Sequence, residues 1–378
     1  MKQLESHIKR DKSCLTNKVI SKSLFKIRNF PVFFGCVDSQ IDEDLKTDME
    51  FFIEEETGLI QLNKLIPLEI LYQKQHAFGV GSVWNLHYEQ FAKFISNGSH
   101  ENVIEIGGAT ERLANKYLSV QDAVWTIIEP NPSEFKNKEI KVIKGFFEDS
   151  KVSINQDDIV VFSHVLEHAY DPRVFLNMIY EKIKKGQNLY FSYPRLEIWL
   201  EKKYTNALNF EHTMFLTETH LDVLLENIGF KIEKKSYFKD HSIFYKLSKS
   251  IPSEKNYPNL FIENKKLFDS FIKYHFDEVK RLNQLMEESN DDFYLFGAHI
   301  FSQFLIVLGL NTSKIKYILD NSKEKQNKRL YGTNLFVRPP SILAKKKNIL
   351  VILKAANYNN EIKQDISNNI NDHVRFIE

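Results

Sequence analysis

The chain has 378 residues, with 51 Lys and Arg against 50 Asp and Glu and a formal net charge of +1. This length predicts about two to three domains, and the balanced charge argues against a nucleic-acid-binding protein, which usually carries a basic excess. The two cysteines, Cys14 and Cys36, exclude a disulfide-rich scaffold and a four-cysteine zinc site made from this chain alone.

No export signal and no membrane segment are expected. The charged first residues contain no apolar run of the kind that a signal peptide needs. The longest apolar stretch, residues 301–310, is shorter than the roughly 20 residues of a membrane-spanning helix.

Residues 1–70 form the first predicted unit, a small and irregular module. Its apolar pieces are short (30–34, 49–53 and 60–62), and residues 41–47 read as an acidic turn. Helical periodicity begins near Leu68 and resumes over residues 83–95.

The second predicted unit, residues 71–249, has an α/β pattern. Its later helices are predicted near residues 111–117, 172–184 and 221–227, and its strands at residues 102–106, 123–129, 141–144, 158–163, 188–192, 230–234 and 242–247. Strands that alternate with helices predict a parallel, doubly wound, Rossmann-like sheet.

A linker and a long helix follow over residues 250–290, with the amphipathic helix at 261–288. Residues 291–378 repeat the α/β pattern on a smaller scale. Their strands are predicted from Phe293, at 315–319 and at 348–353, and their first helix at 300–309. This region is predicted to be a second, smaller Rossmann-like domain.

The turn after the first strand of the α/β unit is the first candidate ligand site. Glu105 is followed by Gly107, Gly108 and Ala109, and Glu129 comes 22 residues after Gly107. A glycine turn lets a ligand approach the backbone, and an acid at that distance can bind a ribose. Because the turn continues into an acid and lacks the G-x-G-x-x-G pattern, it favours S-adenosylmethionine over NAD. A plain tight turn is the alternative interpretation.

Two further segments follow strands that end at the same edge of the predicted sheet. Phe146 and Phe147 could stack on adenine, and Ser163 and His164 would lie near the methionine end of the ligand. His164-x-x-Glu167-His168 also fits the inverted zincin pattern H-x-x-E-H. Since it sits at a strand end and no third ligand helix follows, we predict no metal here.

The motifs together resemble the sugar C-methyltransferase family, S-adenosylmethionine-dependent enzymes that methylate nucleotide-linked keto-deoxysugars. The resemblance is carried by Glu105-x-Gly107, Glu129-Pro130-Asn131, Phe146-Phe147, His164-Val-Leu-Glu-His168, Phe210-Glu211-His212 and Phe296-Gly-Ala-His299. It implies a seven-stranded Rossmann-like methyltransferase domain between the N-terminal module and a C-terminal Rossmann-like domain.

The resemblance also implies roles for single residues. The catalytic group would be His212 as base, Glu211 orienting it, and His168 facing the developing oxyanion. The residues implied to hold S-adenosylmethionine are Glu105, Gly107, Gly108, Ala109, Glu129, Pro130, Phe146, Phe147, Ser163 and His164.

Two departures from the family pattern matter. Members usually carry four zinc-binding cysteines in the N-terminal module, whereas here Thr57-Gly58-Leu59-Ile60-Gln61-Leu62 stands where Cys-Gly-Leu-x-Gln-Leu is expected. We therefore predict a module without zinc. His76-Ala77-Phe78 replaces a Tyr-x-Tyr segment of the active site, which leaves O- or N-methylation of a modified sugar open beside C-methylation.

Two other functions remain open. One is a methyltransferase fold that binds S-adenosylmethionine without turnover, and the other is an NAD-linked enzyme that uses the C-terminal unit. The expected partner is a nucleotide sugar or small glycan substrate, without nucleic acid or membrane, and the chain is expected to be a monomer or homodimer in the cytoplasm.

Overall fold

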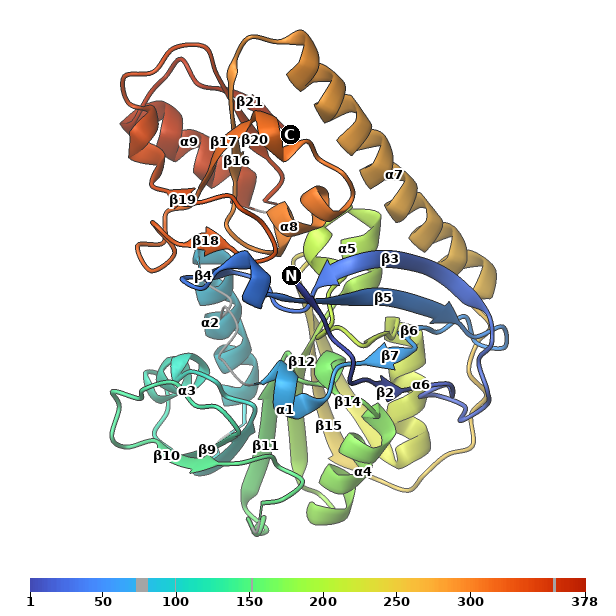
Figure 1. The fold of residues 1–378 in the computed structure, drawn as a ribbon. Helices are drawn as coiled ribbons and strands as arrows, with labels where there is room; N and C mark the ends of the chain where they lie inside the picture. Colours follow the sequence, from blue (N-terminus) through green and yellow to red (C-terminus); the bar gives the residue numbers. More distant parts are fainter. Residues whose placement is uncertain (73–80, 99, 151, 356–357) are drawn as a thin grey trace.

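The computed structural model describes residues 1–72, 81–98, 100–150, 152–355 and 358–378. Three bodies follow one another in it: an N-terminal β-sheet, a large α/β domain and a smaller α/β domain that lies at the top of Figure 1. The predicted α/β fold class is confirmed. Among the described residues, no helix is both long enough and apolar enough to cross a membrane.

The large domain is built on a seven-stranded sheet with the order β10-β9-β8-β11-β12-β15-β14. Its strands are β8 (Asn102–Ile106), β9 (Val124–Glu129), β10 (Lys141–Lys144), β11 (Asp158–Ser163), β12 (Asn188–Pro194), β14 (Phe230–Phe238) and β15 (Ser242–Lys249). Its longer helices are α2 (Ser82–Ser96), α3 (Arg112–Leu118), α4 (Pro172–Lys182) and α6 (Glu218–Ile228).

Helices cover both faces of this sheet, as the apolar composition of its central strands requires. Successive residues of a strand point to opposite faces. Val103 and Val161 accordingly belong to one core cluster together with residues of α2 and α3, whereas Ile104 and Phe162 belong to the other together with residues of α4 and α6.

The prediction of an all-parallel sheet was wrong at one edge. β8, β9, β10, β11 and β12 are parallel, but β15 pairs antiparallel with both β12 and β14. Only residues 239–241 separate β14 from β15. Three residues can make a hairpin, but a crossover between parallel strands needs about a dozen.

The N-terminal module is a β-sheet, so the prediction of an irregular module was wrong. Its elements are β1 (Lys2–Gln3), β2 (Ile8–Lys9), β3 (Ser23–Pro31), β4 (Cys36–Val37), β5 (Leu45–Ile53), β6 (Ile60–Leu62), β7 (Lys64–Leu65) and the short helix α1 (Leu68–Leu71). Thr47, Met49, Phe51 and Ile53 are buried along β5, with the period of two that a half-buried strand requires.

The other two bodies each add a strand to this module. β13 (Met214–Phe215), which lies between α5 (Leu196–Glu201) and α6 in the large domain, pairs with β6. β18 (Arg329–Leu330) of the C-terminal domain pairs with β4. Arg329 also binds Asp44 through two hydrogen bonds of 2.6 and 2.8 Å, with both side chains buried.

The long helix α7 (Phe261–Glu288) has the predicted bounds. It runs from strands β3 and β5 up to the C-terminal domain (Figure 1), and the ring of Phe268 meets the rings of Phe25 and Phe51 at 6.4 and 5.2 Å. The C-terminal sheet is parallel throughout, in the order β19-β17-β16-β20-β21.

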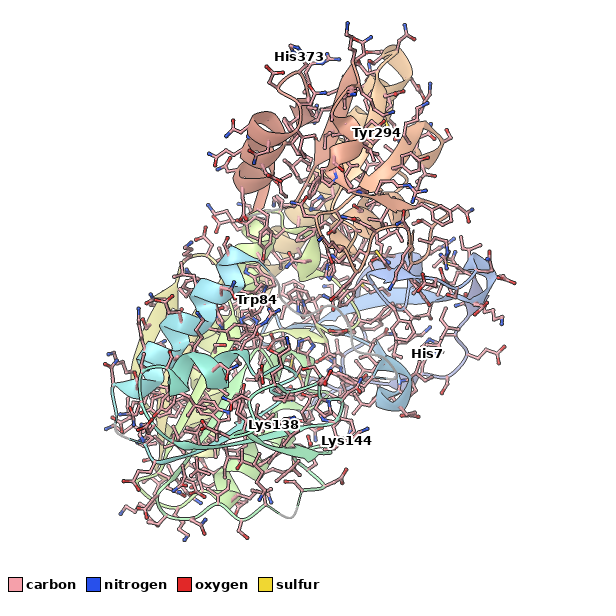
Figure 2. The ribbon with its side chains drawn as sticks, turned by 90° about the vertical axis from the view of Figure 1, so that its left-hand side faces the viewer. His7, Trp84, Lys138, Lys144, Tyr294 and His373 are labelled. Atoms are coloured by element: carbon pink, nitrogen blue, oxygen red, sulfur yellow. The ribbon has the colours of Figure 1, made fainter. Side chains whose placement is uncertain are left out.

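The elements of the C-terminal domain are β16 (Asp292–Phe296), α8 (Ile300–Val307), β17 (Ile315–Leu319), β19 (Val337–Arg338), β20 (Ile349–Leu353), α9 (Asn359–Asn369) and β21 (Arg375–Ile377). In the view of Figure 2, Trp84 of α2 lies at mid-height, between this domain, marked by Tyr294, and the part of the large domain marked by Lys138 and Lys144.

Candidate active site

The glycine turn lies where the strand order of the large sheet reverses. β8 neighbours β9 on one side and β11 on the other, and ligands of such sheets bind at this switch point beyond the carboxyl ends of the strands. Gly107 has φ +74°, and a side-chain carbon built on it would lie 2.6 Å from Cγ2 of Val165. Only glycine fits this turn without a shift of its neighbour.

The buried side chain of Glu105 packs against the glycine turn. It is 3% exposed, and its Oε2 accepts a 2.8 Å hydrogen bond from Nε1 of Trp125. A side-chain carbon at Gly108 would lie 2.7 Å from the Glu105 carboxyl carbon. Burial raises the pKa of Glu105 to about 8. The predicted role of Glu105 as a cofactor ligand is thus better described as support for the glycine turn.

Glu129 is the last residue of β9. It lies beside the glycine turn, since the amide of Gly107 donates to the carbonyl of the preceding residue, Ile128, at 2.9 Å. Its Oε1 accepts from the amide of Asn131 at 2.9 Å. The carboxylate is 7% exposed, and burial raises its pKa. Pro130 continues the chain at the same edge.

Ala109, Phe146 and Phe147 were also predicted to hold the cofactor, and they differ in burial and contacts. The amide of Ala109 closes the turn onto the carbonyl of Gly107 at 3.0 Å. Phe147 is 2% exposed in the core beneath Lys182, whereas the ring of Phe146 meets the ring of Tyr72 at 6.4 Å. Of the two phenylalanines, Phe146 is therefore the one available for stacking.

Ser163 and His164 belong to a buried network of serine and histidine side chains. Ser163 Oγ contacts Ser192 Oγ at 2.8 Å and His87 Nε2 at 3.1 Å. His164 Nε2 lies 2.8 Å from Ser242 Oγ. The sequence analysis did not predict this network. It takes up the polar atoms of two residues that were predicted to face the cofactor.

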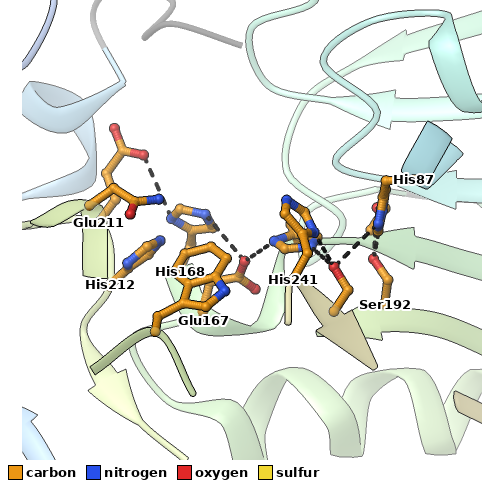
Figure 3. A network of polar contacts seen from close by, with 12 residues as sticks. His87, Glu167, His168, Ser192, Glu211, His212 and His241 are labelled. Atoms are coloured by element: carbon orange, nitrogen blue, oxygen red, sulfur yellow. Dashed lines mark hydrogen bonds and ion pairs between the residues drawn. The ribbon is translucent and has the colours of Figure 1, made fainter. Parts of the chain in front are cut away.

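A second group lies next to this network and contains the three predicted catalytic residues. His168 Nδ1 is 3.7 Å from Glu211 Oε2, and His168 Nε2 is 3.9 Å from Glu167 Oε1. The rings of His168 and His212 lie 5.5 Å apart. We call Glu167, His168, Glu211 and His212 the carboxylate–histidine cluster; Figure 3 shows it joined to the serine–histidine network through Glu167.

The backbone explains why residues far apart in sequence meet here. The amide of Thr213 donates to the carbonyl of Glu167 at 3.2 Å. From the N-terminal module, Arg10 donates to the carbonyls of Leu62, Tyr170 and Thr213. The N-terminal module thus clamps the loop that carries Glu211 and His212 onto the end of β11.

The prediction that Glu211 orients His212 was wrong. His212 Nδ1 donates to the carbonyl of Ala207 at 3.0 Å, and its backbone amide donates to Asn209 Oδ1 at 2.9 Å. Glu211 faces His168 instead. Nδ1 also lies 3.2 Å from Nδ2 of Asn209, so these ring contacts of His212 are made at Nδ1 and not at Nε2.

In the N-terminal module, a carboxylate and three hydroxyls form a buried cluster. Glu54 accepts from Ser13 Oγ at 2.7 Å, from Thr57 Oγ1 at 2.6 Å and from Thr16 Oγ1. The pairs 13/16 and 54/57 have the C-x-x-C spacing of zinc-binding cysteines. The four groups are joined by hydrogen bonds, and they lack the thiolate and imidazole ligands of most structural zinc sites. The E-x-x-T-G sequence was the available signal for this cluster.

The altered segment His76-Ala77-Phe78 lies outside the described residues, so the structure does not address its predicted effect on the acceptor pocket.

Two family models match the chain, and together they cover most of it. A methyltransferase domain matches residues 85–235, and a C-methyltransferase C-terminal domain matches residues 239–378. The protein is an S-adenosylmethionine-dependent methyltransferase. Its two matched domains support membership of the S-adenosylmethionine-dependent C-methyltransferases, and its cofactor is S-adenosylmethionine.

Solved structures of methyltransferases are similar to parts of the chain at low identity. The mitomycin 7-O-methyltransferase MmcR is 16% identical over 45% of this chain and 55% of its own, with a TM-score of 0.38. A methyltransferase from Thermotoga maritima is 20% identical over 44% and 90%, with a TM-score of 0.36. Magnesium protoporphyrin IX methyltransferase from Synechocystis is 11% identical over 46% and 90%, with a TM-score of 0.36. No curated protein matches the chain.

Proposed function

We propose that this methyltransferase transfers a methyl group to a carbon atom of a nucleotide-linked keto-deoxysugar. The observation that carries the proposal is the C-methyltransferase C-terminal domain over residues 239–378, on a chain that gathers two carboxyl and two imidazole groups beside its cofactor turn.

The described residues fit the cofactor. The turn at Gly107 and Gly108 has no room for side chains, so the backbone itself lines the site. One Glu129 oxygen is bound by the backbone, which leaves the carboxylate to accept from ribose hydroxyls, and Phe146 can stack on adenine. When bound, S-adenosylmethionine supplies an electrophilic methyl group on a sulfonium.

The residues of the carboxylate–histidine cluster would manage the proton. Attack by carbon requires loss of a proton next to a ketone and stabilisation of the resulting oxyanion. Burial lowers the pKa of His168 and of His212 to about 4, so both rings are neutral near pH 7. Burial raises the pKa of Glu211 to about 8. The cluster thus offers proton acceptors and an N–H or O–H donor within one buried group.

The direct test is product analysis. The chain is incubated with S-adenosylmethionine that carries a ¹³C methyl group and with a panel of nucleotide-linked keto-deoxysugars, and the products are examined by NMR. We expect a methyl carbon bonded to a sugar carbon. A methoxy or N-methyl signal would replace C-methylation by the O- or N-methyl alternative.

A second measurement separates catalysis from binding alone. With S-adenosylhomocysteine in place of the methyl donor, the enzyme should still exchange the proton next to the ketone with D₂O, because that step needs only the chain's own groups. If S-adenosylhomocysteine binds but no acceptor exchanges a proton or gains a methyl group, the chain is a non-catalytic binding module.

A further inference from the structure

Three members of the carboxylate–histidine cluster are arranged as ligands of one ion. Glu167, His168 and His212 each offer one ligand atom, and these three atoms lie within 4.8 Å of one another. The 3.9 Å between His168 Nε2 and Glu167 Oε1 is too long for a hydrogen bond. Metal bonds of about 2.0 to 2.2 Å place two ligands of one cation about 3 to 3.5 Å apart, so shifts of about 1 Å would close the site.

Glu167 is the residue that most needs a partner. It is fully buried, and neither of its carboxylate oxygens has a hydrogen-bond partner within the described ranges. Its nearest groups are imidazole nitrogens, with His164 Nδ1 at 3.1 Å from Oε1. A carboxylate removed from water without donors is unfavourable by several kcal/mol unless a cation or a proton compensates it.

One of the two histidines, His212, has an outer contact of the kind that metal ligands usually have. A ligating imidazole donates its other N–H to a carbonyl or carboxylate, which fixes the tautomer. His212 Nδ1 lies 3.0 Å from the carbonyl of Ala207 and 3.2 Å from Nδ2 of Asn209, so Nδ1 is engaged and Nε2 is left for a metal. His168 Nδ1 lies 3.7 Å from the Glu211 carboxylate, beyond hydrogen-bond distance, and its Nε2 is on the side of Glu167.

A second group of histidines lies nearby, but its ring nitrogens already have a hydrogen-bond partner. His87, His164 and His241 also lie within 4.8 Å of one another. Ser242 Oγ already lies among them, at 3.2, 2.8 and 2.5 Å from their nitrogens. This trio is satisfied by a hydroxyl group, whereas the Glu167 group is not.

We propose that Glu167, His168 and His212 bind one divalent transition-metal cation. A set of two imidazoles and one carboxylate suits Zn²⁺ or Fe²⁺ better than Mg²⁺ or Ca²⁺, which prefer oxygen ligands. The cation would act as a Lewis acid on an oxygen of the acceptor, a role that rests on the proposed function. His212 is then a ligand in place of its predicted role as base, and Glu211 becomes a proton acceptor of the cluster once it is ionised, above its pKa of about 8.

Metal binding can be measured without any acceptor. The untagged chain is freed of metal with a chelator and titrated with Co²⁺, whose visible spectrum reports nitrogen and oxygen ligands, and Zn²⁺ is then used to displace it. We expect one equivalent of Co²⁺. Glu167→Gln and His212→Asn should each weaken binding by about 100-fold or more, because each removes one of three protein ligands.

The matched control is His241→Asn, which alters the other histidine group and should leave Co²⁺ affinity unchanged. Binding of S-adenosylhomocysteine, measured by calorimetry, shows that each variant has folded. The proposal is overturned if the wild-type chain binds no stoichiometric Co²⁺, or if His241→Asn abolishes binding while Glu167→Gln does not. Co²⁺ binding without any methylated product would refute the proposed function and leave the metal site standing.

Discussion

Replacing Glu54 by alanine tests whether the hydrogen-bonded cluster does the work of a zinc ion in the N-terminal module. Ser13 and Thr57 are each 1% exposed, and their hydroxyls donate to Glu54. The same hydroxyls accept from backbone amides of their own turns, so the carboxylate is the acceptor that Glu54→Ala removes. Thr16 is only partly buried and can turn to water.

The expected loss follows from the two buried hydroxyls. A buried donor left without an acceptor destabilises a protein by about 1 to 3 kcal/mol, so two of them predict a loss of about 4 kcal/mol. This is a large part of the roughly 5 to 15 kcal/mol by which domains are stable. Urea unfolding followed by circular dichroism should show a lower midpoint.

Glu55→Ala is the matched control, because the Glu55 side chain is exposed and forms a surface ion pair with Lys22. Such pairs contribute about 0 to 1 kcal/mol. If Glu54→Ala unfolds at the same urea concentration as Glu55→Ala, the cluster does not stabilise the module and the reasoning fails.

The same cluster can be tested by building a metal site into it. A variant with cysteine at positions 13, 16, 54 and 57 has the paired C-x-x-C spacing of a structural zinc site. We expect it to bind one equivalent of Zn²⁺ at this place and to give the intense thiolate bands of a Co²⁺ complex. A folded variant without thiolate-bound metal would show that these four positions do not converge as zinc ligands do.

Three further predictions concern the cofactor, the junction between bodies and pH. Glu129→Ala should weaken binding of S-adenosylhomocysteine by about 100-fold, because two charge-assisted hydrogen bonds at about 1.5 kcal/mol each are lost; an unchanged dissociation constant in calorimetry would remove Glu129 from the cofactor site. Arg329→Met should destabilise the chain by about 3 to 5 kcal/mol, since it leaves the Asp44 carboxylate buried without its partner; the double variant with Asp44→Leu should recover much of the urea midpoint, and no recovery would contradict a direct pairing. Burial lowers the pKa of His275 to about 4, below the roughly 6.5 of an unfolded histidine. The contribution of His275 to stability is therefore full above pH 6.5 and is lost between pH 6.5 and 4, by about 3 kcal/mol. His275→Phe should reduce the acid loss by this amount, whereas an unchanged pH profile would assign the loss to other groups.

Local patterns in the sequence predicted most of the large domain. The strands at residues 102–106 and 141–144 and the helix at 261–288 have the predicted bounds, because their apolar spacing and flanking polar residues leave one solution. The predictions that were wrong concerned which strands pair with one another and in which direction. Strand direction at β15 depends on the length of one connection, and two strands of the N-terminal module, β6 and β4, pair with strands from the large and the C-terminal domain.

In the candidate site, too, local motifs were predicted from the sequence and contacts between distant residues were not. The sequence predicted a cofactor site at Gly107 and Glu129, and the family resemblance implied catalytic roles for His168 and His212. It could not predict that Glu211 would face His168, since that depends on the backbone bonds of His212. Nor could it predict which polar side chains would be left without partners in the interior.

The N-terminal module contacts the loop that carries Glu211 and His212. Its strand β6 pairs with β13, immediately after His212, and Arg10 binds three carbonyls on both sides of the carboxylate–histidine cluster. The N-terminal module therefore holds the loop that carries Glu211 and His212. It follows that damage to the module should act mainly on the acceptor side. Glu54→Ala should reduce kcat/KM for the acceptor while the affinity for S-adenosylhomocysteine stays the same, because the contacts that hold Gly107 and Glu129 come from the large domain itself. Equal loss of both would mean that the module supports the whole domain and has no special hold on the loop.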